Sequence, residues 1–105
     1  MISYNQALEV HSEMVKRFGG ADGVRDNRLL ESALARPFMT FDGVDLYPTS
    51  IEKASAIIES IVVNHPFLDG NKRTGYTLGR LLLLEDNIDI IAEKELKYDF
   101  VINVA

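Results

Sequence analysis

The sequence predicts an all-α bundle of about five helices, formed by a single domain over residues 1–105. Apolar residues recur at intervals of three and four along much of the chain, which is the period of a helix with one buried face. Two pairs have the spacing of a capping box at a helix start, Ser3 with Gln6 and Thr49 with Glu52. The chain has 105 residues, of which 47% are hydrophobic, and this is enough for one compact core.

The composition argues against several classes of protein. The chain has no cysteine, which excludes a disulfide framework and a thiolate metal site. No apolar run is long enough to cross a bilayer, and the first residues lack the features of a signal peptide. The net charge of −5 argues against broad nucleic-acid binding. We therefore expect a cytoplasmic protein with neither a DNA nor a membrane partner.

The first two helices are predicted from their ends. The first runs from Ser3 to Gly19, and its apolar face contains Tyr4, Leu8, Val15 and Phe18. His11 lies on the same face, and we expect a packed histidine with a local hydrogen bond and no catalytic role. The second helix is capped by Asp26 and stopped by Pro37.

Residues 38–47 have a different pattern, with an Asp42-Gly43 pair between apolar residues, which is typical of a short hairpin. The large side chains of this segment are Phe38, Phe41, Leu46 and Tyr47. Two interpretations have similar weight: these side chains fold back onto the core, or the hairpin is a flap that docks a target. We expect the hairpin to lie over the N-terminal end of the helix that begins near Asn71.

The third helix is predicted over residues 50–64 and should end at His65, because Pro66 disfavours helical geometry in the residue before it. Ala54, Ile58 and Ile61 follow helical spacing, and His65 continues the same line. The spacing therefore predicts that His65 faces the core.

The fourth helix is predicted over residues 71–84 as the innermost helix, because leucines surround its second half. Gly75 and Gly79 are four residues apart, which would let a neighbouring helix cross closely. We expect a short extended segment at residues 88–91 and a last helix that begins near Ala92.

The connection between the third and fourth helices concentrates the chemistry of the chain. The free backbone N–H groups at the start of a helix suit an anion, and Gly70 lets the backbone approach a ligand closely. Lys72 and Arg73 add positive charge at the same place, and Asp69 could bind Mg²⁺ beside a polyphosphate. We interpret this segment as a phosphate-binding turn with His65 as a general base at its entrance.

The run His65-Pro66-Phe67-Leu68-Asp69-Gly70-Asn71-Lys72-Arg73 resembles the signature of the Fic/Doc superfamily, and its Asn-Lys-Arg form is similar to the Doc branch. Residues 23–37 also resemble that branch. The resemblance implies a Fic-like helical bundle in which a flap aligns the target segment by strand addition. It also implies a toxin that transfers the terminal phosphate of ATP to elongation factor Tu and thereby blocks translation. By the same resemblance, a small antitoxin neutralises this toxin.

Our leading hypothesis is transfer of a phosphate from ATP to a hydroxyl group of a target protein. His65 would accept the proton of that hydroxyl, and Asp69 would orient it or hold Mg²⁺. By resemblance, Arg73 is the third catalytic residue and Phe67 is a buried anchor. The groups that would neutralise the phosphates are the backbone at Gly70 and Asn71 and the side chains of Lys72 and Arg73.

Two alternatives stay open. Fic proteins that transfer an adenylyl group have glycine at the position of Lys72 and a second arginine at that of Tyr76, so both positions favour the kinase. A catalytically silent binding domain on the same fold is the other alternative. Doc-like proteins usually continue into one more helix, which we expect to be missing here. The apolar surface left behind would need cover from a partner or from a second copy in a homo-oligomer.

Overall fold

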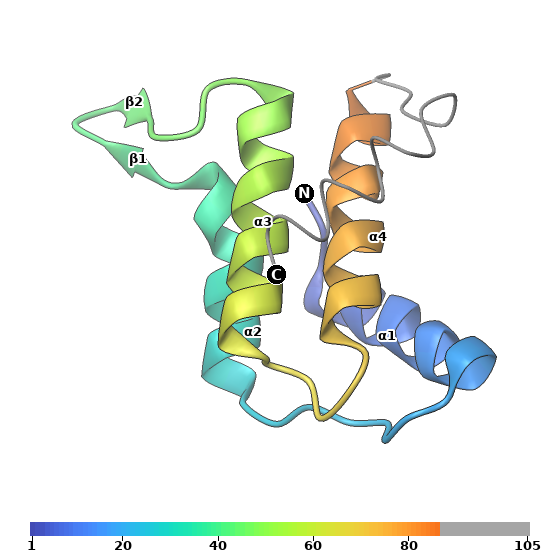
Figure 1. Ribbon diagram of the computed structural model, residues 1–105. Helices are drawn as coiled ribbons and strands as arrows, with labels where there is room; N and C mark the ends of the chain where they lie inside the picture. The colour runs from blue at the N-terminus through green and yellow to red at the C-terminus, as the bar shows by residue number, and fades with distance from the viewer. Residues whose placement is uncertain (87–105) are drawn as a thin grey trace.

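The computed structural model describes residues 1–86 and has four α-helices in this range (Figure 1). In chain order the elements are α1 Tyr4–Phe18, α2 Asn27–Ala35, the 3₁₀ turn η1 Arg36–Phe38, β1 Thr40–Phe41, β2 Val44–Asp45, α3 Ser50–Asn64 and α4 Asn71–Glu85. The predicted helical bundle is confirmed. The extended segment expected at residues 88–91 and the last helix expected near Ala92 lie outside the described residues.

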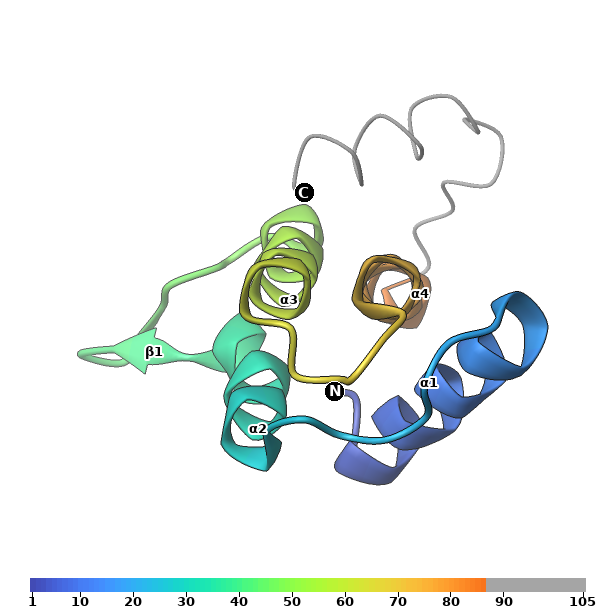
Figure 2. The same cartoon turned by 60° about the horizontal axis from the view of Figure 1, so that its bottom comes forward.

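Helices α3 and α4 form an antiparallel pair, and α1 and α2 pack on the same side of it (Figure 2). Helix α2 lies against α3, and α1 lies against α4. The largest fully buried apolar side chains are Leu30, Ile57, Ile61, Phe67 and Leu78. Because both helices of the pair contribute to this core, α3 shares the centre of the bundle with α4.

The helix starts follow the predicted caps. The Ser3 side chain accepts a hydrogen bond from the Gln6 N–H, and the Gln6 side chain accepts one from the Ser3 N–H, which completes a capping box. Asp26 caps α2, and Thr49 caps α3. Helix α2 ends at Ala35, two residues before Pro37, as predicted, and the chain continues into the 3₁₀ turn η1, which contains this proline.

The hairpin has the predicted two-residue turn, with left-handed backbone at both Asp42 and Gly43. Its expected position over the start of α4 is wrong. The hairpin lies at the opposite end of the bundle, where α3 begins and α4 ends (Figure 1). Lys53 in the first turn of α3 is 3.7 Å from Asp45 and donates to the carbonyl of Tyr47, and this holds the hairpin there.

The large side chains of the hairpin segment divide between the two interpretations. Phe38 packs against the core, and the Tyr47 hydroxyl accepts a hydrogen bond from Arg36. Phe41 is 76% exposed and Leu46 is 48% exposed, so the hairpin itself presents apolar surface to solvent.

No helix within residues 1–86 is both long and apolar enough to cross a membrane.

The close crossing of α3 and α4 depends on glycine, as predicted. A Cβ atom built on Gly79 would lie 2.5 Å from Cδ1 and 2.6 Å from Cγ1 of Ile58, and 3.3 Å from the carbonyl of Ala54. A Cβ atom built on Gly75 would meet nothing closer than 3.4 Å, which is ordinary contact. The contact at Gly79 is therefore the tighter of the two.

We predict that Gly79→Ala lowers the free energy of unfolding by about 1–3 kcal/mol, because Ile58 must move within a packed core. Gly75→Ala is the matched control. It should change stability by less than about 1 kcal/mol, since alanine also favours the helix. Chemical denaturation of the two variants measures this difference. Equal stabilities would contradict the tighter crossing at Gly79.

Candidate functional site

Helix α3 ends at His65, as the sequence predicts, and the backbone there is left-handed with φ 51° and ψ 60°. The expectation that His65 faces the core is wrong, because the residue is exposed. Ile58 and Ile61 lie on the buried face of α3, but the helical spacing no longer holds after Asn64, where the helix ends. The left-handed backbone of His65 therefore directs this residue away from the buried face. Pro66 causes this departure by disfavouring the helical conformation before it.

Arg25 caps the end of α3 from the segment before α2. Its side chain donates hydrogen bonds of 2.6 Å to the carbonyl of His65 and of 2.6 Å to the carbonyl of Asn64. The backbone N–H groups of Arg25 and Asp26 both donate to the carbonyl of Pro66. The sequence reasoning gave Arg25 no role, and the only available signal was its place in the run that resembles the Doc branch.

Asn71 closes the turn between α3 and α4. Its side-chain oxygen accepts from the Phe67 N–H at 3.0 Å, and its side-chain nitrogen donates to the Phe67 carbonyl at 3.0 Å. Asn71 is only 7% exposed. The amide group is therefore held within the turn, so we expect Asn71 to meet a phosphate through its backbone N–H. Phe67 is fully buried, as expected for an anchor.

Helix α4 begins without a side-chain cap, after Gly70 in left-handed geometry. Its first N–H groups are the anion-binding feature that the sequence predicts. Lys72 and Arg73 are both exposed beside them. The Arg73 guanidinium lies 4.2 Å from the ring centroid of Phe18. Phe18 is 56% exposed, so it supports Arg73 from outside the core, whereas the sequence placed it on the buried face.

Asp69 is exposed, and one of its carboxylate oxygens accepts a 2.9 Å hydrogen bond from the Ala21 N–H. Gly20 passes so close that a Cβ atom there would lie 3.0 Å from Cβ of Asp69. The other carboxylate oxygen is left for a metal ion or a hydroxyl group. Within residues 1–86, no cluster of three or more acidic or histidine side chains could hold a metal. A Mg²⁺ ion would therefore need phosphate oxygens as further ligands.

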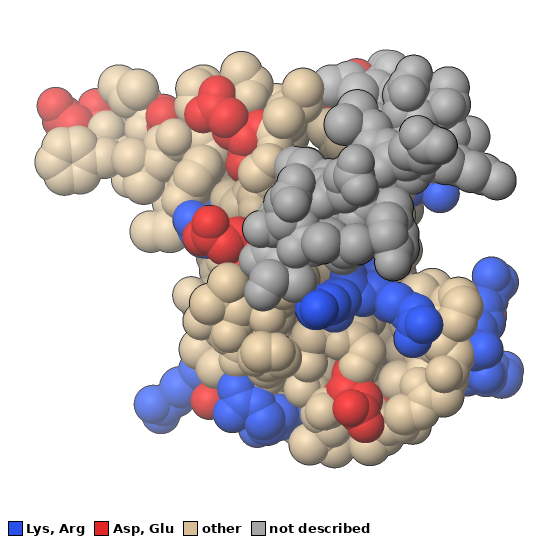
Figure 3. Space-filling model, in the orientation of Figure 1, with Lys and Arg blue, Asp and Glu red and all other residues tan. Residues whose placement is uncertain are grey.

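Charge is distributed unevenly over the face that Figure 3 shows. Lysine and arginine side chains gather over the first half of α4 and the last turn of α1, with acidic side chains also among them near the turn, and further acidic side chains lie toward the hairpin and the start of α3. Tyr76, one turn beyond Lys72, adds no charge at neutral pH, because a tyrosine hydroxyl is protonated there. Burial raises the pKa of this hydroxyl further, against the opposing effect of Arg80. The positive charge is thus concentrated at the end of the bundle that contains the turn.

The structure brings most of the predicted site residues together, but it does not bring the flap to them. His65, Asp69, Gly70, Asn71, Lys72 and Arg73 all belong to one connection and the first turn of α4. The flap residues Phe41, Asp42, Gly43 and Leu46 belong to the hairpin segment at the other end of α3 (Figure 1), and Phe38 and Tyr47 flank it in sequence. That helix has 15 residues, or about 22 Å.

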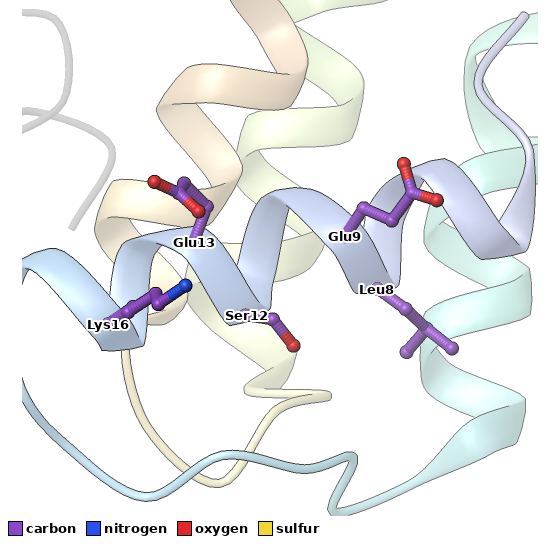
Figure 4. Close-up of a pocket in the computed structure, with 5 residues that line it drawn as sticks. All are labelled: Leu8, Glu9, Ser12, Glu13 and Lys16. Carbon is purple, nitrogen blue, oxygen red and sulfur yellow. The ribbon is translucent and has the colours of Figure 1, made fainter.

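A shallow depression on α1 contains none of the predicted site residues. Its lining comes from a single helix and consists of Leu8, Glu9, Ser12, Glu13 and Lys16 (Figure 4). Both carboxylates point away from the leucine, and nothing in this arrangement suggests a reaction. The turn between α3 and α4, where the predicted site residues meet, is the candidate site.

Comparison with known proteins gives a family match over most of the chain. The model of the Fic/DOC family matches residues 1–83, a range that includes the whole turn. The chain is 42% identical over 76 residues to Toxin Doc of Mycolicibacterium smegmatis, and the match covers 72% of this chain and 58% of that protein. The chain therefore spans less than two thirds of the length of this relative. No solved structure matches the chain significantly.

We predict that Asn71→Asp lowers the free energy of unfolding by about 2–3 kcal/mol. The carboxylate cannot donate to the Phe67 carbonyl and would be buried against it. Asn5→Asp, on the exposed surface of α1, is the control and should change stability by less than about 0.5 kcal/mol. Thermal or chemical denaturation compares the two. A variant at Asn71 as stable as the control would show that the turn does not depend on this side chain.

Proposed function

The chain belongs to the Fic/DOC family, and from this premise we propose that it is a Doc-like toxin that transfers a phosphate from ATP to a hydroxyl group of a protein. The name of the matched relative, Toxin Doc, supports the toxin part of this proposal. The turn between α3 and α4 supports the transfer, because it combines an exposed imidazole with an anion-binding helix start. The adenylyl transfer found in other Fic proteins is the competing reaction.

The observation that carries the proposal is the backbone of His65. A residue other than glycine in left-handed geometry costs on the order of 1–2 kcal/mol, and helices that end this way usually have glycine at that position. Asp42 is the other such residue within residues 1–86, and it occupies a hairpin turn where this geometry is normal. A histidine kept at a strained and exposed helix end points to a chemical role for its ring.

The chemical roles follow from the positions around the turn. His65 would take the proton from the attacking hydroxyl, a contribution of roughly 10²–10⁴-fold to the rate. The free oxygen of Asp69 would orient that hydroxyl or share a Mg²⁺ ion with the phosphates. Bound Mg²⁺ would neutralise phosphate charge. The N–H groups at the start of α4, with Lys72 and Arg73, would hold the phosphates in place.

The charge distribution supports a polyphosphate at this end of the bundle. The chain carries a net charge of −5, yet lysine and arginine gather where α4 begins and α1 ends (Figure 3). A local positive field of this kind raises the concentration of a polyanion such as ATP at the turn. Tyr76 replaces the second arginine of adenylylating relatives with an uncharged group, which favours transfer of the terminal phosphate.

The partners are part of the same proposal. By resemblance the target is elongation factor Tu, and a small antitoxin binds the toxin. The exposed hairpin, with Phe41 76% and Val44 67% exposed, is available for contact with the body of the target. It lies about one helix length from His65, so it would hold the target at a distance from the reacting hydroxyl.

We predict that the chain, given Mg²⁺ and its target, transfers label from the γ phosphate of ATP and none from the α phosphate. Two parallel incubations, each with ATP labelled at one position, measure this directly. A heat-denatured sample of the chain is the control for non-enzymatic labelling. Label retained only from the α position would exclude the kinase and establish adenylyl transfer.

We predict that His65→Ala and His65→Gly both reduce transfer by about 10²–10⁴-fold, because neither variant has a base at this position. The two should differ in stability. Glycine relieves the left-handed strain of the folded state, but the greater entropy of its unfolded chain offsets part of that gain. The His65→Gly variant should therefore be more stable than the His65→Ala variant by up to about 1 kcal/mol. Denaturation and transfer assays are run on the same preparations.

Either half of this prediction can fail separately. Transfer at the parental rate in His65→Ala would remove the imidazole from the chemistry. Equal stability of the glycine and alanine variants would instead remove the backbone strain on which the functional interpretation of His65 rests.

A further inference from the structure

His11 is a buried polar residue for which the proposed reaction has no use. Its side chain is 1% exposed, and its ring stacks on Phe67 with the centroids 4.0 Å apart and the planes 6° from parallel. Its Nε2 atom lies 2.7 Å from the carbonyl oxygen of Asp69, which is 58 residues away in sequence. The packed position is as predicted, but the hydrogen bond is a long-range contact with the candidate site.

The chemistry of this contact defines the proton on the ring. A carbonyl oxygen can only accept a hydrogen bond, so Nε2 of His11 must be the protonated donor. The second ring nitrogen, Nδ1, lies 3.4 Å from a carboxylate oxygen of Asp22. The ring is therefore held by stacking on Phe67 and by the hydrogen bond to Asp69, with the Asp22 carboxylate beside its other nitrogen.

This hydrogen bond determines how the peptide between Asp69 and Gly70 is oriented. All peptide bonds within residues 1–86 are trans, and in a trans peptide the C=O and N–H groups point in opposite directions. Because the Asp69 carbonyl points toward His11 on α1, the Gly70 N–H points away from α1. No backbone acceptor within residues 1–86 pairs with this N–H.

The outward N–H of Gly70 completes an anion-binding geometry. Gly70 is left-handed, with φ 72° and ψ 22°, and Asn71 after it is helical. Successive N–H groups in this pair of conformations form a concave nest for an anion. If the peptide were reversed, the Asp69 carbonyl would replace the N–H and repel a phosphate.

We propose that His11 is a positioning residue that holds the Asp69–Gly70 peptide with its N–H turned outward, so that the turn is formed before a phosphate arrives. Its consequence for nucleotide rests on the proposed function. The carboxylate of Asp69 is fixed separately by the Ala21 N–H at 2.9 Å, so the same residue is held at its backbone by α1 and at its side chain by the following loop.

The test compares His11→Phe with His11→Gln. Phenylalanine keeps a ring against Phe67 and has no donor, whereas the glutamine amide can donate to the Asp69 carbonyl in place of Nε2. Calorimetry with Mg²⁺ and a non-hydrolysable ATP analogue measures binding, and denaturation measures stability. Glu9→Gln, a change on the exposed side of α1 two residues before His11, is the control.

We expect His11→Phe to bind the analogue about tenfold more weakly than the parent, which corresponds to about 1.4 kcal/mol. His11→Gln should bind within about threefold of the parent, since the glutamine amide restores a hydrogen-bond donor to the Asp69 carbonyl. A structural role alone would change stability without this recovery by glutamine. Parental affinity in a folded His11→Phe variant would overturn the proposal.

A second readout does not depend on nucleotide. The ¹⁵N resonances of the imidazole should show a protonated Nε2, and the Gly70 amide resonance should shift in His11→Phe and return in His11→Gln. A bare Nε2, or an unmoved Gly70 resonance, would overturn the positioning role. If the parent binds no triphosphate, the proposed function fails, while these resonances still decide whether His11 orients the peptide.

Discussion

The pair of hydrogen bonds between the Asn71 side chain and the Phe67 backbone is the interaction on which the rest of the site depends. It joins the start of α4 to the residue that anchors the turn in the core. With this pair in place, Phe67 is buried, His65 stays outside, and the first N–H groups of α4 are left without a cap. An asparagine is needed because the site requires one donor and one acceptor on a single short side chain.

Features that depend on neighbours in sequence could be predicted from the sequence. Ser3 and Asp26 predicted two helix starts, Asp42-Gly43 predicted the hairpin turn, and Gly79 predicted the close crossing of α3 and α4. In each case the physical cause lies within a few residues or follows helical periodicity. The uncapped start of α4 beside two cations could be predicted for the same reason, since Gly70, Lys72 and Arg73 are close in sequence.

Features that depend on distant contacts could not be predicted. The outward direction of His65 follows from one left-handed residue that breaks the helical spacing, and the caps that Arg25 supplies come from 39 and 40 residues away. His11 looked like an ordinary core residue because its partner, the carbonyl of Asp69, has no signature in the sequence. The hairpin was placed at the wrong end because its anchor is Lys53 at the start of α3.

The turn combines several arrangements that cost stability. Cations stand at a helix N-terminus, a histidine occupies a left-handed position, and backbone donors at the turn have no backbone acceptor within residues 1–86. The glycine-mediated packing of α3 against α4 offsets these costs elsewhere in the bundle. Such a division is expected where a site must be rigid before its ligand binds, because the scaffold then supplies the stability that the site lacks.

The most direct measurement is a crystal structure of the chain with Mg²⁺ and a non-hydrolysable ATP analogue. Phosphate oxygens should lie about 2.7–3.2 Å from the N–H groups of Gly70 and Asn71, with the terminal phosphate nearest to the His65 ring. Phosphates bound elsewhere on the bundle, or an imidazole that points away from the start of α4, would contradict a catalytic turn at this place.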